Sequence, residues 1–144
     1  MKIEIMDQIP GEEDRVTFHI KYMTENIARA VNILKSPDSV PVYIDGQALL
    51  LPADDIFYVE SVDLKTFVYT EKSVYQSRLR LYEFDEILSK GDFLRISKQV
   101  IVNIRKITGV SPAGDSRFLA VLTNGEKIII SRQYVPSLKE RFGL

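Results

Sequence analysis

The chain has 144 residues, of which 45% are hydrophobic and 27% are charged, and its formal net charge is -1. This length and balance suit one soluble globular domain, with or without a small appendage. Because the chain has no cysteine and one histidine, disulfide frameworks, thiolate metal sites and histidine-based metal centres are excluded. We expect no membrane span and no secretory signal, since no apolar run approaches about 18 residues, and therefore a cytoplasmic protein.

The charges are unevenly distributed along the chain. Residues 1–40 have a net charge of -2 and residues 41–89 a net charge of -5, whereas residues 90–144 contain 10 Lys/Arg and 4 Asp/Glu, a net charge of +6. A basic last third beside an acidic middle indicates one surface suited to a polyanion. The alternative is ordinary charge scatter on a solvated surface.

The N-terminal residues alternate between apolar and polar side chains, which predicts short strands over 2–5 and 15–21. His19 falls on the polar face of the second strand, where a surface role is favoured over a catalytic one. An apolar stripe then predicts an amphipathic helix over 24–36, capped by Thr24.

A segment with two prolines and an Asp-Gly pair, residues 36–47, follows this helix and indicates a boundary. We therefore assign residues 1–38 to a small β-β-α unit with a possible dimerisation or regulatory role. We assign residues 39–144 to the main domain. The predicted fold class is α+β, mostly β.

The main domain is rich in short apolar runs separated by turn residues. Strands are predicted over residues 40–45, 48–52, 56–62, 67–71, 93–97, 100–110, 117–123 and 127–131. Asn124-Gly125 predicts a type I′ hairpin turn between the last two strands. Helices are predicted over 81–90 and 132–142. In the second, Ser131 is the expected cap and Pro136 places the regular helix near Val135.

No pattern of residues indicates catalysis. The sequence has no glycine-rich phosphate loop, no Ser/His/acid set and no cluster with metal-ligand spacing. The pair Asp54-Asp55 is best interpreted as a turn before a strand. We therefore expect no enzyme, no catalytic residue, no cofactor, no metal and no small-molecule substrate.

Basic residues instead fall at predicted strand ends and turns, and at the start of the last helix. They are Lys65, Lys98, Arg105, Arg117 and Arg132, the last followed by Gln133. A helix N-terminus attracts phosphate. Arginine can also bond guanine in two places, and Asn or Gln suits adenine. Such residues could both grip a nucleic-acid backbone and read bases.

Three segments in order carry a more specific signal: DDIFYVESVDLKTFVYT, then LYEFDEILSKGDFLRISKQVIVNIRKITGV, then LTNGEKIIISRQYVPSLKERFG. This series resembles the LytTR DNA-binding domain family over about residues 40–144. The resemblance implies a mostly β domain of small sheets with short helices that inserts connecting loops into DNA grooves. Most members carry a receiver domain, and here residues 1–38 would take its place in a stand-alone regulator.

The resemblance also implies which residues read bases. The first is Lys65 or Thr66, in the turn after the IFYVE strand, the second is Asn103, and the third is Arg132. Residue type alone leaves another role open for Asn103, namely a structural amide bonded to a turn backbone.

Supporting contacts to phosphate are expected from Arg95 and Lys98, and Arg105 and Gln133 complete the candidate set. For Arg95 and Arg105, plain solvated charge is an equal alternative. Together these residues predict a transcriptional regulator that binds double-stranded DNA sequence-specifically, as a homodimer on repeated half-sites. The alternative function is a protein-protein interaction module that uses the acidic N-terminal part and its amphipathic helix.

Overall fold

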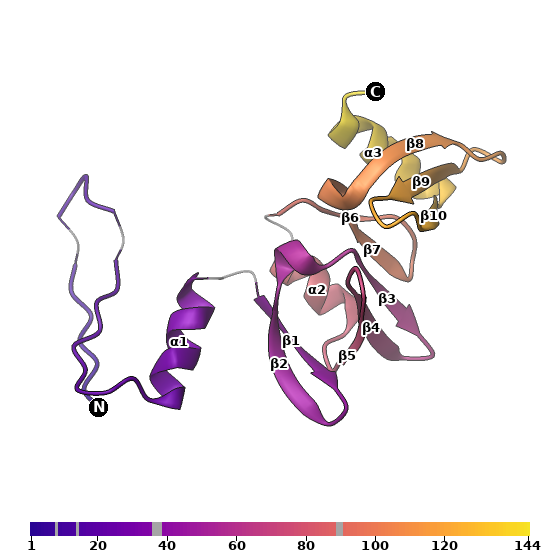
Figure 1. The fold of residues 1–144 in the computed structure, drawn as a ribbon. Coiled ribbons are helices and arrows are strands. Elements are labelled where there is room, and N and C mark those ends of the chain that lie inside the picture. Colours follow the sequence, from indigo (N-terminus) through magenta and orange to yellow (C-terminus); the bar gives the residue numbers. More distant parts are fainter. Residues whose placement is uncertain (8, 14, 36–38, 89–90) are drawn as a thin grey trace.

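The computed structural model describes residues 1–7, 9–13, 15–35, 39–88 and 91–144 (Figure 1). Its strands form a seven-stranded sheet in the order β2-β1-β5-β4-β3-β7-β6 and a three-stranded sheet in the order β10-β9-β8, and all pairs are antiparallel. The strands are β1 (Ser39–Ile44), β2 (Gln47–Pro52), β3 (Tyr58–Val62), β4 (Lys65–Tyr69), β5 (Val74–Ser77), β6 (Phe93–Arg95), β7 (Val100–Asn103), β8 (Ile107–Pro112), β9 (Phe118–Leu122) and β10 (Lys127–Ile130). The helices are α1 (Glu25–Lys35), α2 (Leu81–Leu88) and α3 (Val135–Phe142), with short 3-10 helices η1 (Ala53–Asp55), η2 (Ile104–Lys106) and η3 (Arg132–Tyr134).

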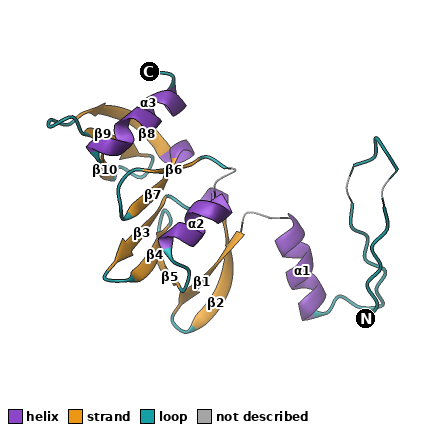
Figure 2. Cartoon of the chain, turned by 180° about the vertical axis from the view of Figure 1, so that it is seen from behind, coloured by secondary structure: helices purple, strands orange, loops and turns teal. Residues whose placement is uncertain are grey.

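The mostly β class predicted from the sequence is confirmed (Figure 2). Among the described residues, no helix is long and apolar enough to cross a bilayer. The last predicted helix divides into η3 and α3, and α3 begins at Val135 with Pro136 in its first turn, as expected. Ser131, the expected cap, makes no side-chain capping bond.

The hairpin turns follow from residues that tolerate positive φ. Asp45 and Gly46 join β1 to β2 with φ of 48° and 77°, the backbone of a two-residue type I′ turn. The turn at Asn124-Gly125 is different, and the type I′ prediction is wrong there. Gly125 has φ 87° without a positive φ at Asn124, and Gly125 N donates to Leu122 O at 2.9 Å. The loop is therefore one residue longer, a tight turn followed by a glycine bulge.

Strand β7 belongs to both hydrophobic cores of the chain. Ile101 packs into the core of the large sheet, while Val102, which points to the opposite face, packs into the core beneath the small sheet. Because both faces of β7 are covered, its sequence is a continuous apolar run instead of an alternating one.

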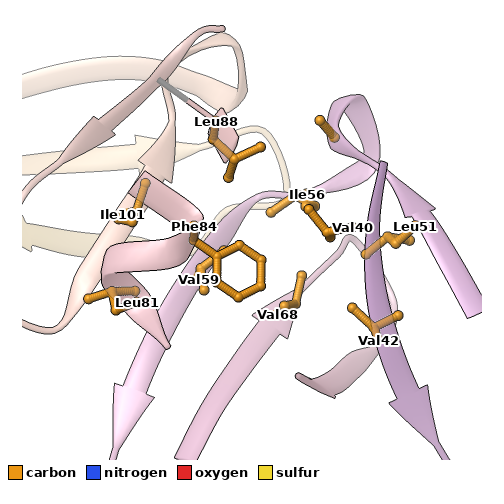
Figure 3. Packing of buried hydrophobic residues seen from close by; sticks show 11 residues of the cluster. Val40, Val42, Leu51, Ile56, Val59, Val68, Leu81, Phe84, Leu88 and Ile101 are labelled. Atoms are coloured by element: carbon orange, nitrogen blue, oxygen red, sulfur yellow. The ribbon is translucent and has the colours of Figure 1, made fainter. Parts of the chain in front are cut away.

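Each core is closed by one helix. Phe84 of α2 is fully buried and lies against Val59 and Val68 of the large sheet (Figure 3). In the second core, Leu138 of α3 is fully buried among Ile130 and other residues of the small sheet and β7. The two cores fix the two sheets to each other through β7, and this arrangement positions the turns described below.

The N-terminal part differs from the prediction. Residues 2–5 and 15–21 form no strand, and the helix predicted over 24–36 is α1, where Ile27 N donates to Thr24 Oγ1 at 3.3 Å. An isolated pair of short strands is marginally stable at best without a third strand or a covering layer, which is the physical reason for the missing ladder. Some predicted residues lie outside the described ones. They are residues 36–38, which end the helix predicted over 24–36 and begin the expected boundary, and residues 89–90, which end the helix predicted over 81–90. The division at residue 38 stays a prediction.

Two stacked tyrosines predict that the stability of the fold depends on pH in the alkaline range. The rings of Tyr58 and Tyr69 lie 4.2 Å apart, and Tyr69 Oη donates to Glu60 Oε1 at 3.2 Å. Burial, a hydrogen bond to Glu126 and neighbouring carboxylates raise the pKa of Tyr58 well above its usual range, and burial also raises the pKa of Tyr69.

A raised phenol pKa means that the fold favours the neutral ring. This stabilisation is present in full below about pH 10, the pKa of a tyrosine in the unfolded chain, and is lost as pH rises through the folded pKa. The free energy of unfolding, measured by urea titration between pH 8 and 11.5, should fall less steeply above pH 10 in Tyr58→Phe than in the wild type. Parallel pH profiles for the two proteins would contradict this account.

Candidate nucleic-acid interface

Three turns that are distant in sequence meet at one end of the large sheet. They are the β3–β4 turn, the β6–β7 turn and the junction between β10 and η3. Ser61 N at the end of β3 donates to Gln99 O in the second turn at 2.8 Å. Ser131 N in the junction donates to Ile96 O at the start of the second turn, also at 2.8 Å. We call residues 63–65, 97–99 and 131–133 the three-turn surface. It lies on the side of the fold away from the N-terminal segment in both views (Figure 1, Figure 2).

Each of the three turns presents one exposed cation. Lys65 begins β4 directly after its turn, Lys98 lies in the β6–β7 turn, and Arg132 begins η3, with the exposed Gln133 beside it. Within the part of the chain that the structure describes, these three cations have no ion-pair partner. Asp63 in the first turn is an acidic neighbour on the surface. The side chains of Lys65, Lys98 and Arg132 are therefore available to an external anion.

Arg95 does not take the phosphate-binding role expected from the sequence. Its guanidinium pairs with Asp85 Oδ2 at 2.8 Å and donates through Nε to Ser97 O at 3.0 Å and through Nη2 to Lys98 O. All three of its nitrogens are thus engaged with the protein. Arg95 instead stabilises the β6–β7 turn and fixes the position of the backbone that carries Lys98.

Arg80 and Leu64 belong to this end of the sheet but were not among the residues predicted from the sequence. Arg80 Nη1 donates to Leu64 O at 2.9 Å, at the tip of the β3–β4 turn. The pairing of Thr66 with Ser77 brings residue 80 back to this turn. A basic residue in the otherwise acidic middle of the sequence was the available signal for Arg80. Leu64, which is 81% exposed, gave no signal at all.

Asn103 has the structural role that the sequence left open. It is 2% exposed, its Nδ2 donates to Ile56 O at 2.9 Å, and its Oδ1 accepts from Arg105 N at 3.0 Å. The amide therefore ties η2 to the segment before β3 and does not reach the surface. This geometry corrects the expectation of a direct base contact by Asn103.

Two further candidates also lie away from the three-turn surface. Thr66 is 2% exposed and faces the interior of the sheet, so Lys65 is the available member of that pair. Arg105 follows the opposite end of β7, about 10 Å or more along the strand from the β6–β7 turn at roughly 3.3 Å per residue. Its Nε lies 3.5 Å from Asp92 Oδ2, and it lines a pocket of about 160 Å³ with Asp54 and Asp92. This acidic setting is unsuited to phosphate.

The β3–β4 turn carries backbone strain that can be tested. Asp63 and Leu64 have φ of 50° and 66°, and leucine seldom adopts this left-handed conformation. Glycine at position 64 would relieve the strain, so Leu64→Gly should raise the free energy of unfolding by about 0.5–1 kcal/mol. Urea denaturation measures the change. A loss of stability in Leu64→Gly would show that the turn is not strained in this way.

Comparison with known proteins adds the family. Residues 46–143 match the model of the family described as the LytTr DNA-binding domain. The chain belongs to this family. A solved LytTr DNA-binding domain of a methyl-accepting/DNA response regulator from Bacillus cereus superimposes with a TM-score of 0.69 at 28% sequence identity, covering 74% of this chain and 97% of that one. The three-turn surface therefore lies within the LytTR domain.

Curated relatives of this LytTR chain share about a quarter of its residues. The sensory transduction protein LytT of Enterococcus faecalis is 27% identical over 140 residues, which cover 94% of this chain and 58% of that protein. The transcriptional regulatory protein YpdB of Escherichia coli O6:H1 is 24% identical, covering 96% and 61%. The present chain thus spans about three-fifths of the length of these two relatives. An uncharacterised HTH-type transcriptional regulator of Staphylococcus aureus is 26% identical and is matched over 99% of its length.

Proposed function

We propose that this chain is a transcriptional regulator that binds duplex DNA sequence-specifically through the three-turn surface. The observation that carries the proposal is the pair of backbone hydrogen bonds, Ser61 N to Gln99 O and Ser131 N to Ile96 O, which bring Lys65, Lys98 and Arg132 to one end of the sheet. Family membership and the regulator names of its relatives support the same function. Such a protein would act in the cytoplasm.

The dimensions of the surface suit contact with more than one groove. Lys65 is on β4 and the Arg132 junction is bonded to the end of β6, which are three strand spacings apart. At about 4.8 Å for each spacing, the cations extend over roughly 14 Å, which exceeds the major-groove width of about 12 Å. Turns that project from one sheet end can therefore enter neighbouring grooves without a recognition helix.

Different chemistry on the three turns suggests different roles. Arg132 offers a planar guanidinium that can bond the two acceptors on the major-groove edge of guanine, and Gln133 beside it suits adenine. Lys98 and Lys65 are point charges on flexible stems and fit phosphate better than bases. In this scheme Arg132 and Gln133 supply specificity, while the lysines set register and most of the salt dependence.

We also propose that two copies bind together on repeated half-sites. A single module with a few cations buries about 600–1,000 Å² on DNA, whereas specific sites of nanomolar affinity often involve larger surfaces. A second copy doubles the contacts and makes the spacing of the half-sites part of the specificity.

A selection of bound duplexes from a random DNA pool tests the proposal directly. The full chain should enrich one short sequence element, present twice at a fixed spacing, and a labelled duplex of that sequence should bind more tightly than a scrambled one. Enrichment of the sequence element in a single copy would contradict the proposed dimer but not sequence-specific DNA binding. If no sequence is enriched and low-salt binding is absent, sequence-specific DNA binding is wrong.

A further inference from the structure

The N-terminal segment presents many large apolar side chains to solvent. Nine of them, between residues 3 and 23, are 38–94% exposed. They are Ile3, Ile5, Met6, Ile9, Val16, Phe18, Ile20, Tyr22 and Met23. By contrast, the two cores of the LytTR domain are closed by their own helices.

The backbone of the same segment has unpaired hydrogen-bonding groups. Residues 1–7 and 15–21 run beside each other as extended chain before α1 (Figure 1, Figure 2), yet neither is assigned to a strand. Between the described residues 1 and 23, the backbone bond to another backbone group is Glu12 N to Ile9 O at 3.1 Å. Extended chain with alternating apolar side chains and unsatisfied N–H and C=O groups is a template for pairing with another strand.

The size of this apolar surface indicates a macromolecular occupant. Fully burying one such side chain removes roughly 60–120 Å² of apolar surface, from about 1.5–3 kcal/mol at 25 cal/mol per Å². The nine side chains therefore expose on the order of 500 Å² or more, near the upper end of what monomers show and comparable to the apolar part of a standard interface of about 800 Å² per partner.

A groove lies within this apolar surface and could receive part of a partner chain. It has a volume of about 840 Å³ and is lined by both extended segments and by Ile27 of α1, with Ile5, Val16 and Phe18 among its walls. Ile3, Ile9, Tyr22 and Met23 do not line the groove, so the apolar surface extends beyond what a small ligand in the groove would cover.

The charges favour a second copy of the same chain over DNA or an anionic lipid surface. Residues 1–14, the first half of the segment, carry Lys2 and five acids, a net charge of -4, whereas residues 15–23, the second half, carry Arg15 and Lys21 and no acid, a net charge of +2. The acidic excess repels phosphate. In a two-fold arrangement, the acidic half of one copy can face the basic half of the other, as a self-complementary interface requires.

We propose that residues 1–7, 9–13 and 15–27 form the dimer interface, in which the extended segments of two copies pair and fill each other's grooves. This inference deepens the proposed function because it rests on the dimer and assigns its location. It also places the interface on the side of the fold away from the three-turn surface (Figure 1), so that both surfaces of DNA-binding turns stay accessible.

Sedimentation of the full chain over a concentration series tests the location. Ile5→Glu and Phe18→Glu place an unpaired charge in the proposed interface and should each raise the dimer dissociation constant by at least about thirtyfold. Tyr82→Glu is the matched control, because Tyr82 of α2 is 63% exposed and outside the segment, and its dissociation constant should equal that of the wild type. Thermal melting confirms that the exposed substitutions leave the LytTR domain folded.

The outcomes separate the interface from the function. If the wild-type protein is a monomer at tens of micromolar, both free and bound to DNA, the proposed dimer and this inference are both wrong. A wild-type dimer that Ile5→Glu and Phe18→Glu leave intact overturns the inference alone. Binding of a single half-site by monomeric Ile5→Glu should persist, and DNA binding that is absent from wild type and variants alike would instead sink the proposed function.

Introduced cysteines provide a second measurement, because the chain has none of its own. Single-cysteine variants at Ile5, at Phe18 and at the control position Tyr82 are oxidised under the same dilute conditions. Positions 5 and 18 should give covalent dimers, and position 82 should not. Equal cross-linking at all three positions, or at position 82 alone, would place the contact elsewhere on the molecule.

Discussion

Replacing Arg132 by alanine should lower the affinity for the selected DNA site by about 5- to 150-fold, which corresponds to about 1–3 kcal/mol. The reason is that Arg132 is exposed at the start of η3, has no ion-pair partner among the described residues, and offers the two-pronged geometry that reads guanine. Fluorescence anisotropy with the selected duplex and a scrambled duplex measures the loss. Specific binding should fall more than binding to the scrambled duplex.

The matched control is Arg117→Ala. Arg117 is also an exposed arginine near the small sheet, but it lies beyond β8, where its Nη2 is 3.9 Å from Asp115 Oδ2. Its removal should change affinity for the selected site by less than about threefold. If Arg117→Ala and Arg132→Ala lower the affinity for both duplexes by the same factor, Arg132 contributes only its positive charge. Its proposed role in reading bases is then wrong.

Replacing Asn103 by alanine should instead destabilise the fold. The substitution leaves Ile56 O and Arg105 N without their partner at a site that is 2% exposed, and it opens a small void. Each buried unsatisfied group costs about 1–3 kcal/mol, so with two such groups the free energy of unfolding should fall by about 2–6 kcal/mol. Urea denaturation measures this loss. At a temperature where the variant is still folded, its affinity for DNA should be close to that of the wild type.

Asn124→Ala gives the comparison for a solvent-exposed asparagine that also bonds a turn. Asn124 Oδ1 accepts from Glu126 N at 3.0 Å, but water can replace this bond, and the expected loss is below about 1 kcal/mol. An Asn103→Ala variant with wild-type stability and lost DNA specificity would contradict the structural role and restore the direct base contact.

Much of the fold could be predicted from the sequence because local patterns and tertiary structure agree. The Asp45-Gly46 hairpin, α2 and α3 each follow from turn chemistry, periodicity or proline placement. The prediction of N-terminal strands was wrong for a physical reason. Alternation of apolar and polar side chains shows that a segment can pair as a strand, but it does not show that a partner strand is present. In the proposed dimer, the alternating segments at residues 2–5 and 15–21 would have a partner strand.

Part of the candidate set comes together in the structure, and its contact with DNA stays a prediction. Lys65, Lys98 and Arg132 were named from the basic residues at turns, and the structure brings them together. Arg95 and Asn103 could not be assigned correctly, because sequence does not reveal that a side chain turns inward to bond carbonyl groups such as Ser97 O and Ile56 O. The sequence also did not show where each residue lies along β7. In the structure, Lys98 precedes the strand and Asn103 ends it, so the length of the strand separates them.

The salt dependence of DNA binding in Lys98→Ala and Arg105→Ala tests the three-turn surface most directly. Both residues are exposed cations flanking β7, at opposite ends of it. In a plot of log affinity against log salt concentration, Lys98→Ala should flatten the slope by about one unit, since one phosphate contact is lost, and Arg105→Ala should leave it unchanged. A flatter slope in Arg105→Ala with a wild-type slope in Lys98→Ala would contradict this surface and place DNA at the other end of the sheet.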